Sequence, residues 1–474
     1  MANAAAIFDL DHTLVPRAAW PVFERHLTGV GLEPTNLLPG ERTVRRLLDL
    51  GGDNRVSMQL DRAGVRATKG WPVSTVHEAA EAAGLDLAGQ VLPYGLQELE
   101  DQRAAGRITV LATPLPEQLV RPLAERIGFD DVVATRWAVD GDSYAGHVDG
   151  PYVWGRQKLA AVQEWAKRHD VALEDSYAFA HAFADAALLG SVGRPVAVDP
   201  DPRLAALAAA RRWRVRWFDV PKGVVKVAGR ELQEWLRPLA REDLVGNARI
   251  DLSGLENIPR QGPAIVVFNH RSYFDGTVVG MAVSKAGRSA RGIGKKEVFD
   301  APLIGPFMKA FGGVRVDRGT GSDEPVRAAA RALRAGEVVM IAPEGTIPRG
   351  PAFFEPELKG RWGAARLAHE TRAPVIPLGL WGTEHVWPRN QRLPRMVFPG
   401  PPPKVTAQIG PPVRLRYDDV DADTRRIMEA IVDQLPVEAR VRRTPTEAEL
   451  RRTYPANYRG DPARELSRRP GFDR

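Results

Sequence analysis

The stretch AAIFDLDHTLV, Ala5 to Val15, decides the fold of the first half of the chain. The apolar run AAIF is followed at once by Asp9 and Asp11, with Thr13 two residues further on. Such a run predicts a buried strand of a parallel sheet, whose carboxyl end faces the ligand crevice of an open α/β fold. Because alternate strand residues share a face, two carboxylates are expected together there, suited to hold Mg²⁺ or to attack phosphorus.

The same α/β pattern continues to about residue 220. Three further short apolar runs predict strands: GRITVLAT (106–113), RPVAVDP (194–200) and WRVRWFDV (213–220). Residues 16–100 are mostly helical and polar, which predicts a helical cap inserted after the first strand. We therefore expect residues 1–220 to form a Rossmann-like parallel sheet with a helical cap.

A second α/β unit is predicted over residues 246–436. Its expected strands are GPAIVVFNH (262–270), EVVMIAPEG (337–345) and APVIPLGLWG (373–382). The segment SDEPVRAAARALRAG (322–336) has an N-cap serine, acidic residues and a proline early and a glycine at its end, which predicts a helix. Residues 437–474 are Arg-rich and are expected to follow the surface or to be partly disordered.

The junction between the units, residues 221–245, has a helical period. In VVKVAGRELQEWLRPLA (224–240) apolar residues recur at steps of three and four, with charged residues on the other side. This predicts an amphipathic helix that is interrupted by Pro238. Two interpretations remain open at this stage: a linker helix packed on a domain, or a basic helix lying on a lipid surface.

Composition restricts the class of protein. The 66 Lys and Arg against 59 Asp and Glu give a net charge of +7, which suits anionic small molecules or anionic lipid. No nucleic-acid-binding signature occurs, and the absence of cysteine excludes disulfides and thiol nucleophiles. The chain has no signal-peptide pattern and no apolar run of roughly 18 residues. We expect a cytoplasmic protein in peripheral contact with the inner face of the cell membrane, its oligomeric state undetermined.

FDLDHTLV resembles the first motif of the haloacid dehalogenase superfamily, in its phosphoserine-phosphatase-like branch. The resemblance extends to about residue 218, and the helical insertion resembles the cap of that branch. It implies that Asp9 is the nucleophile that forms an aspartyl-phosphate and that Asp11 is the general acid/base. It also implies that Thr113 contacts the phosphoryl oxygens, that Lys158 offsets their charge, and that Asp9, Asp11 and Asp185 hold Mg²⁺.

The fourth motif of that superfamily departs from its pattern here. In YAFAHAFADAALLG, His181 stands where the family has the acid that binds Mg²⁺, and Asp185 occupies the place of the later acid. Mg²⁺ prefers hard oxygen donors, whereas imidazole suits transition metals better. We therefore expect weakened Mg²⁺ binding and reduced phosphatase activity in the first unit.

A second group of polar residues lies in VVFNHRSYFDG, where His270 precedes Asp275 by five residues. A carboxylate on one imidazole nitrogen leaves the other nitrogen to act as a base towards an alcohol. The alternative is a surface histidine beside a helix-capping aspartate. Further along, IAPEGTIPRG ends a strand in a turn whose backbone N–H groups and Thr346 hydroxyl suit a phosphate.

VVFNHRSYFDG, GGVRVDR, IAPEGTIPRG and APVIPLGLWG together resemble the four blocks of the 1-acylglycerol-3-phosphate (lysophosphatidate) acyltransferases, over residues 246–415. The resemblance implies that His270 is the general base and Asp275 its partner, and that the acceptor hydroxyl attacks an acyl-CoA or acyl-carrier-protein thioester directly. It places the acceptor's phosphate on a set of residues comprising Arg318, Glu344, Gly345, Thr346 and Lys296. The family's arginine after Glu-Gly-Thr is replaced by Ile347, so Arg349 is a further candidate.

The leading hypothesis is therefore an acyltransferase of phospholipid synthesis with a phosphatase-like first domain. On this hypothesis acyl transfer requires no cofactor, and Mg²⁺ is expected only in the first domain. Two alternatives remain: a Mg²⁺-dependent phosphomonoester phosphatase, or acylation of a different lysophospholipid or a glycolipid. A third hypothesis makes the first domain a scaffold or ligand sensor.

Overall fold

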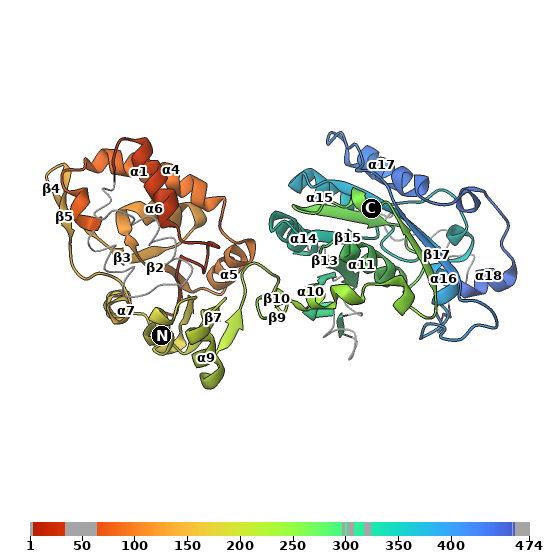
Figure 1. Cartoon of the computed structure of the whole chain (residues 1–474), viewed down its shortest axis with the longest axis horizontal. Coiled ribbons are helices and arrows are strands. Elements are labelled where there is room, and N and C mark those ends of the chain that lie inside the picture. Colours follow the sequence, from red (N-terminus) through yellow and green to blue (C-terminus); the bar gives the residue numbers. More distant parts are fainter. Residues whose placement is uncertain are drawn as a thin grey trace. The chain divides into compact units, whose positions relative to one another are not determined.

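The computed structural model describes residues 3–33, 64–295, 299–300, 308–316, 324–456 and 458–459. The chain divides into two compact units, Met1–Asp219 and Val220–Arg474, each built around its own sheet (Figure 1). The predicted α/β class, with a parallel sheet first and a second α/β domain after it, is confirmed. None of the described helices is long and apolar enough to cross a membrane.

The first unit contains a six-stranded sheet in the order β3-β2-β1-β6-β7-β8, and every neighbouring pair is parallel. The strands are β1 (Ala5–Phe8), β2 (Ile108–Pro116), β3 (Asp131–Thr135), β6 (Tyr177–Ala180), β7 (Arg194–Val198) and β8 (Arg214–Arg216). Ala6 and Phe8 of β1 belong to one hydrophobic core and Ala5 and Ile7 to another, as the alternation of a fully buried strand requires.

Helices cover both faces of this sheet (Figure 1). One face holds α1 (Trp20–Gly29), α4 (Val73–Ala88), α5 (Pro93–Ala104) and α6 (Glu117–Ile127). The other holds α7 (Arg156–Arg168), α8 (Ala186–Leu189) and α9 (Pro202–Arg211), and a hairpin of β4 (Trp137–Asp140) and β5 (Ser143–Val148) lies between α6 and α7 in the chain. The described part of the predicted cap is helical, and residues 34–63 lie outside the described residues.

The second unit contains a seven-stranded sheet in the order β11-β17-β16-β12-β15-β13-β14, in which only β16 and β17 pair antiparallel. Its strands are β11 (Arg249–Ser253), β12 (Ala264–Phe268), β13 (Ala290–Lys295), β14 (Val314–Val316), β15 (Val338–Ile341), β16 (Val375–Trp381) and β17 (Lys404–Ile409). Its described helices include α11 (Asp275–Lys285), α14 (Glu324–Arg334), α15 (Gly363–Thr371), α16 (Thr383–Val386) and α17 (Val420–Asp433).

The prediction of one amphipathic helix across the junction is wrong. The segment forms a hairpin and short helical turns instead: β9 (Lys226–Val227), β10 (Arg230–Glu231), α10 (Leu232–Leu236) and a 3₁₀ turn (Arg237–Leu239). Ala228 and Gly229 have φ of 50° and 75°, a left-handed pair that turns the chain back on itself. Glu231 then pairs with buried Arg291 at 2.7 Å, so tertiary contacts of the second unit override the helical period.

The tail after residue 437 follows the surface in its described part. It contains α18 (Glu447–Arg452), which begins with a capping box formed by Thr446 and Glu449. The hydroxyl of Thr453 accepts a hydrogen bond from the backbone N–H of Gly350 at 2.8 Å. This contact attaches the tail to the loop that follows β15.

Candidate functional site

The first unit brings together three charged side chains at the carboxyl end of β1. Asp9 directly follows the strand, and Lys158 reaches it from the first turn of α7, with Nζ 2.8 Å from Asp9 Oδ1. The same ammonium lies 2.9 Å from Asp185 Oδ2. Asp9 continues the face that carries Ala5 and Ile7, which packs against α7 and α8, so strand alternation aims it at Lys158.

Burial gives this cluster unusual electrostatics. Burial raises the pKa of the Asp185 carboxyl to about 6, although the Lys158 ammonium opposes the shift; the negative charge of Asp9 adds to it. Burial also disfavours the charged form of Lys158, but the two carboxylates outweigh it and raise the pKa of this ammonium. Lys158 therefore stays charged and holds two carboxylates in a site where its side chain is almost fully buried.

The remaining phosphatase-motif residues surround the cluster. Thr13 donates a hydrogen bond to Asp9 Oδ2 at 3.1 Å, a contact that was not predicted although Thr13 belongs to the quoted motif. Asp11 accepts a hydrogen bond from the backbone N–H of Ala19 at 2.8 Å, next to the start of α1. Thr113 is buried near the end of β2, the parallel neighbour of β1, and therefore lies at the same edge of the sheet.

The predicted Mg²⁺ ligands Asp9, Asp11 and Asp185 have a cation and two imidazole rings as neighbours. The Lys158 ammonium, a cation, bridges Asp9 and Asp185. The ring of His181 stacks on that of His12 with centroids 5.1 Å apart, and its buried Nδ1 has no hydrogen-bond partner among the described residues. No group of three or more His, Cys, Asp or Glu side chains in the described chain is placed to hold a metal ion. By the resemblance to the superfamily, this imidazole stands in the place of an acid that binds Mg²⁺, and imidazole suits Mg²⁺ less well than an oxygen donor.

Restoring an acid at position 181 is expected to strengthen Mg²⁺ binding. His181→Asp supplies the missing hard donor and one negative charge, so we expect an affinity gain of about tenfold or more, measured by calorimetric titration with MgCl₂. His77→Asp makes the same charge change at an exposed position of α4 and should leave the affinity unchanged. If His181→Asp and the wild-type protein bound Mg²⁺ with equal affinity, position 181 would not be a Mg²⁺ ligand position.

The second unit joins His270 and Asp275 at the carboxyl end of β12. Nδ1 of His270 lies 2.7 Å from Oδ2 of Asp275, the first residue of α11. The same oxygen accepts hydrogen bonds from the backbone N–H groups of Arg271 and Ser272 at 2.7 and 2.8 Å. Asp275 is fully buried, whereas the His270 side chain is 26% exposed. A buried carboxylate therefore orients an accessible imidazole, which is the arrangement of a general base rather than of a surface pair.

Neighbouring strands hold the loop that carries His270. Its backbone N–H donates to Glu344 Oε2 at 2.6 Å, because β12 and β15 are parallel neighbours and end side by side. The buried side chain of Asn269 exchanges two hydrogen bonds with the backbone of Leu380 in β16, at 2.7 and 2.9 Å. These contacts leave His270 little freedom to move away from Asp275.

Arg271 and Glu384 form a second ion pair beside this loop, at 2.7 Å. The Arg271 guanidinium also lies over the rings of Phe353 and Trp381, at 4.3 and 4.2 Å from their centroids. Burial disfavours the charged form of Glu384, but Arg271 outweighs it and lowers the pKa of this carboxyl. Sequence reasoning missed this pair because its two members lie 113 residues apart.

The Glu-Gly-Thr turn lies beside the loop that carries His270. The Glu344 carboxylate supports His270, and Gly345 adopts a left-handed φ of 69°. A side chain at Gly345 would lie 3.1 Å from the guanidinium nitrogen of Arg361, a cation that no sequence motif indicated. Arg349 instead lies over the ring of Tyr458 at 5.4 Å. Thr346 is half-buried, and the predicted phosphate ligands Lys296 and Arg318 lie outside the described residues.

Comparison with known proteins finds a different family in each half of the chain. A haloacid dehalogenase-like hydrolase model matches residues 6–189, and an acyltransferase model matches residues 249–381. The "Inhibition of morphological differentiation protein" of Streptomyces azureus is 31% identical over 222 residues, 46% of this chain and 80% of that protein. The "Probable phosphatase Rv3661" of Mycobacterium tuberculosis is 30% identical over 227 residues, 46% of this chain and 77% of that protein.

The chain belongs to the haloacid dehalogenase-like hydrolases and carries an acyltransferase domain in its second half. Among solved structures, the 1-acyl-sn-glycerophosphate (LPA) acyltransferase PlsC of Thermotoga maritima is similar, with 25% identity and a TM-score of 0.33. That similarity covers 43% of this chain and 76% of that protein.

Proposed function

We propose that the second unit transfers a fatty acyl group from an acyl-CoA or acyl-carrier-protein thioester to the hydroxyl of a lysophosphatidate-like acceptor. The observation that carries the proposal is the 2.7 Å contact between His270 Nδ1 and the buried carboxylate of Asp275. Because that contact occupies Nδ1, Nε2 is the nitrogen that faces the substrate as a base.

The reaction follows from this arrangement. Nε2 of His270 takes the proton of the acceptor hydroxyl, and the hydroxyl oxygen attacks the thioester carbonyl. The carbon–sulfur bond breaks, and the leaving thiolate takes the proton back from the imidazolium. Asp275 stabilises the imidazolium while it exists, and Glu344 keeps the backbone of His270 in place. No acyl-enzyme and no metal is required for these steps.

A phosphate on the acceptor has cationic and amide donors nearby. We assign it to the turn at Gly345 and Thr346, with Arg361 beside that turn. Lys296 and Arg318 complete the proposed site as the resemblance to the acyltransferases implies. Arg361 supplies the positive charge that the family places directly after Glu-Gly-Thr and that Ile347 lacks here.

An exposed apolar surface in the segment after α16 supports contact with a bilayer. Leu393, Met396 and Val397 are 75%, 70% and 87% exposed, in a stretch from residue 388 to 404 that contains basic but no acidic residues. Trp387 connects this surface to the catalytic loop, since its carbonyl accepts a hydrogen bond from the Ser272 hydroxyl at 2.7 Å. We propose that this loop contacts an anionic membrane in which the acceptor resides.

The test measures acyl transfer by the full chain to lysophosphatidate in anionic vesicles and to a soluble short-chain analogue. Leu393→Ser/Val397→Ser should lower the vesicle rate about tenfold by weakening membrane contact, and leave the rate on the soluble acceptor unchanged. Leu85→Ser/Val139→Ser, a matched exposed pair in the first unit, should alter neither rate. The membrane proposal fails if both pairs behave alike, and the acyltransferase proposal fails if neither acceptor is acylated.

A second function is proposed for the first unit, namely the binding of phosphomonoesters with slow hydrolysis. The buried cluster of Asp9, Lys158 and Asp185 supports it, because nucleophile and cation are placed as phosphoryl transfer requires. His181 is the residue that holds the hydrolysis rate down. The His181→Asp variant should therefore hydrolyse a generic phosphate ester faster than the wild-type protein in the presence of Mg²⁺.

A further inference from the structure

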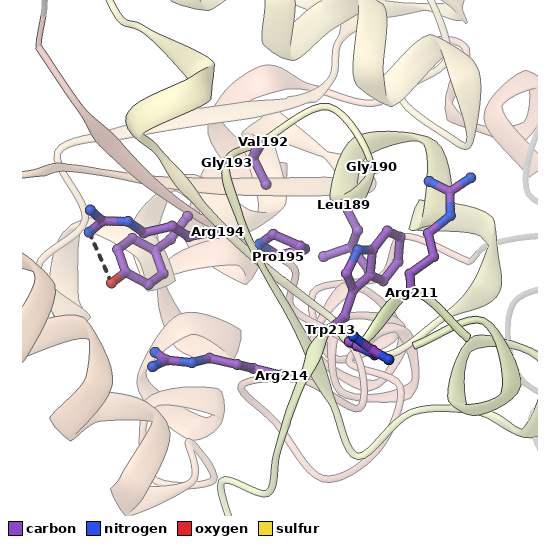
Figure 2. Close-up of a pocket in the computed structure, with 11 residues that line it drawn as sticks. Leu189, Gly190, Val192, Gly193, Arg194, Pro195, Arg211, Trp213 and Arg214 are labelled. Atoms are coloured by element: carbon purple, nitrogen blue, oxygen red, sulfur yellow. Dashed lines mark hydrogen bonds between the residues drawn. The ribbon is translucent and has the colours of Figure 1, made fainter. Parts of the chain in front are cut away.

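A cavity of about 590 Å³ lies at the edge of the first sheet opposite to Asp9. Tyr177, Arg194 and Arg214, the first residues of β6, β7 and β8, contribute to its lining (Figure 2). The loops at 189–193 and 211–213 complete it. Because β1 and its neighbours run parallel, this amino edge is separated from Asp9 by the length of the strands, roughly 15 Å. The cavity is therefore distinct from the phosphatase-like site.

The lining is strongly cationic. It contains Arg194, Arg211, Arg212 and Arg214 and no Asp or Glu. No carboxylate pairs with any of these four guanidinium groups in the described parts of the chain. Figure 2 shows three of them, Arg194, Arg211 and Arg214, around Pro195 and Trp213. All four arginines are exposed, and together they give this surface a positive potential that attracts an anion.

Two aromatic rings line the same cavity. The guanidinium groups of Arg107 and Arg194 lie 4.8 and 5.2 Å from the centroid of Tyr177, and Arg194 also donates a hydrogen bond to the Tyr177 hydroxyl at 3.2 Å. Arg211 lies 5.5 Å from the centroid of Trp213. The rings thus orient the guanidinium groups. Tyr177 is already covered by Arg107, Arg194 and Phe179, so Trp213 is the lining ring on which a planar group of a ligand can stack.

We propose that this cavity binds a nucleotide with at least two phosphate groups. Arginine recognises phosphate oxygens through paired hydrogen bonds, and Trp213 offers a ring to the base. The volume lies within the usual range for small-molecule sites. Since the cavity is at the opposite edge from Asp9, the nucleotide is a bound effector of the first unit and is not cleaved there.

The experiment titrates the full chain with ADP by calorimetry in EDTA. Arg194→Gln/Arg214→Gln should weaken ADP binding about tenfold or more, because two charged phosphate contacts are lost. Arg168→Gln/Arg203→Gln removes the same charge from exposed positions of α7 and α9 and should change the affinity less than about twofold. Full ADP affinity in the first pair, equal losses in both pairs, or no ADP binding by the wild-type protein would overturn the proposal.

A second arm separates the base from the phosphates. Trp213→Leu should weaken ADP binding and leave pyrophosphate binding unchanged, since only the nucleotide has a ring to stack. Pyrophosphate that binds as tightly as ADP, or a Trp213→Leu variant with unchanged ADP affinity, would overturn the assignment to a nucleotide.

Discussion

Replacement of His270 by alanine is expected to reduce acyl transfer about a thousandfold and to leave the second unit folded. The side chain is partly exposed, and its ring contacts Asp275 and the ring of Phe268, so its removal opens no large cavity. What is lost is the base that takes the acceptor proton, and general-base catalysis contributes about 10²–10⁴-fold. Initial rates with acyl-CoA and lysophosphatidate, at saturating concentrations of each, measure the effect on kcat.

A second His–Asp pair in the same unit supplies the control. Nε2 of His369 lies 2.8 Å from Oδ2 of Asp423, which is buried as Asp275 is. Burial disfavours ionisation of Asp423, but hydrogen bonds from the backbone N–H groups of Arg416 and Tyr417 outweigh it and lower the pKa of this carboxyl to about 2. His369→Ala should alter stability and spare the transfer rate. Equal rates for His270→Ala and the wild-type protein would exclude the proposed mechanism.

Replacement of Lys158 by methionine is expected to lower the free energy of unfolding of the first unit by about 3–5 kcal/mol at pH 7. Methionine preserves most of the volume but leaves Asp9 and Asp185 buried without the ammonium that contacts both, at 2.8 and 2.9 Å. Differential scanning calorimetry of the full chain measures the change as a lower melting temperature of the first unit. Lys167→Met, on the exposed side of the same helix, should shift it little.

The loss in Lys158→Met should shrink as the pH falls. A buried carboxyl has a raised pKa, so the folded state binds protons more tightly than the unfolded state and gains stability in acid. In the wild-type protein the pKa of Asp185 is raised to about 6, so this carboxyl also stabilises the folded state in acid. The stability that it adds is fully present below about pH 4 and is lost as the pH rises towards 6. In Lys158→Met, which lacks the ammonium, the pH range in which protonation of the buried carboxyl groups stabilises the fold extends to higher pH. A melting temperature of Lys158→Met equal to that of the wild-type protein at pH 7 would contradict the assigned role of Lys158.

Some features of the candidate sites were predictable because they are local. Asp9 follows a continuous apolar strand, and the five-residue separation of His270 and Asp275 is short enough for one loop to bring them together. Lys158 was placed correctly near Asp9 only through resemblance to a family, since 149 residues separate the two. The prediction of a helix at the junction was wrong because the turn at Gly229 and the contact of Glu231 with Arg291 outweigh the helical period of the sequence.

The sequence by itself determined part of the two sheets, including the strands β1, β12 and β15 and the motifs that follow them, because apolar runs, turn residues and short motifs act over a few positions. Only the tertiary structure decided which distant side chains meet. The approach of Arg361 to Gly345, the support of His270 by Glu344 and the arginine-lined cavity at β6, β7 and β8 all join different strands or loops. Strand order and register set those contacts, and both the order and the register are established by the packing of the whole unit.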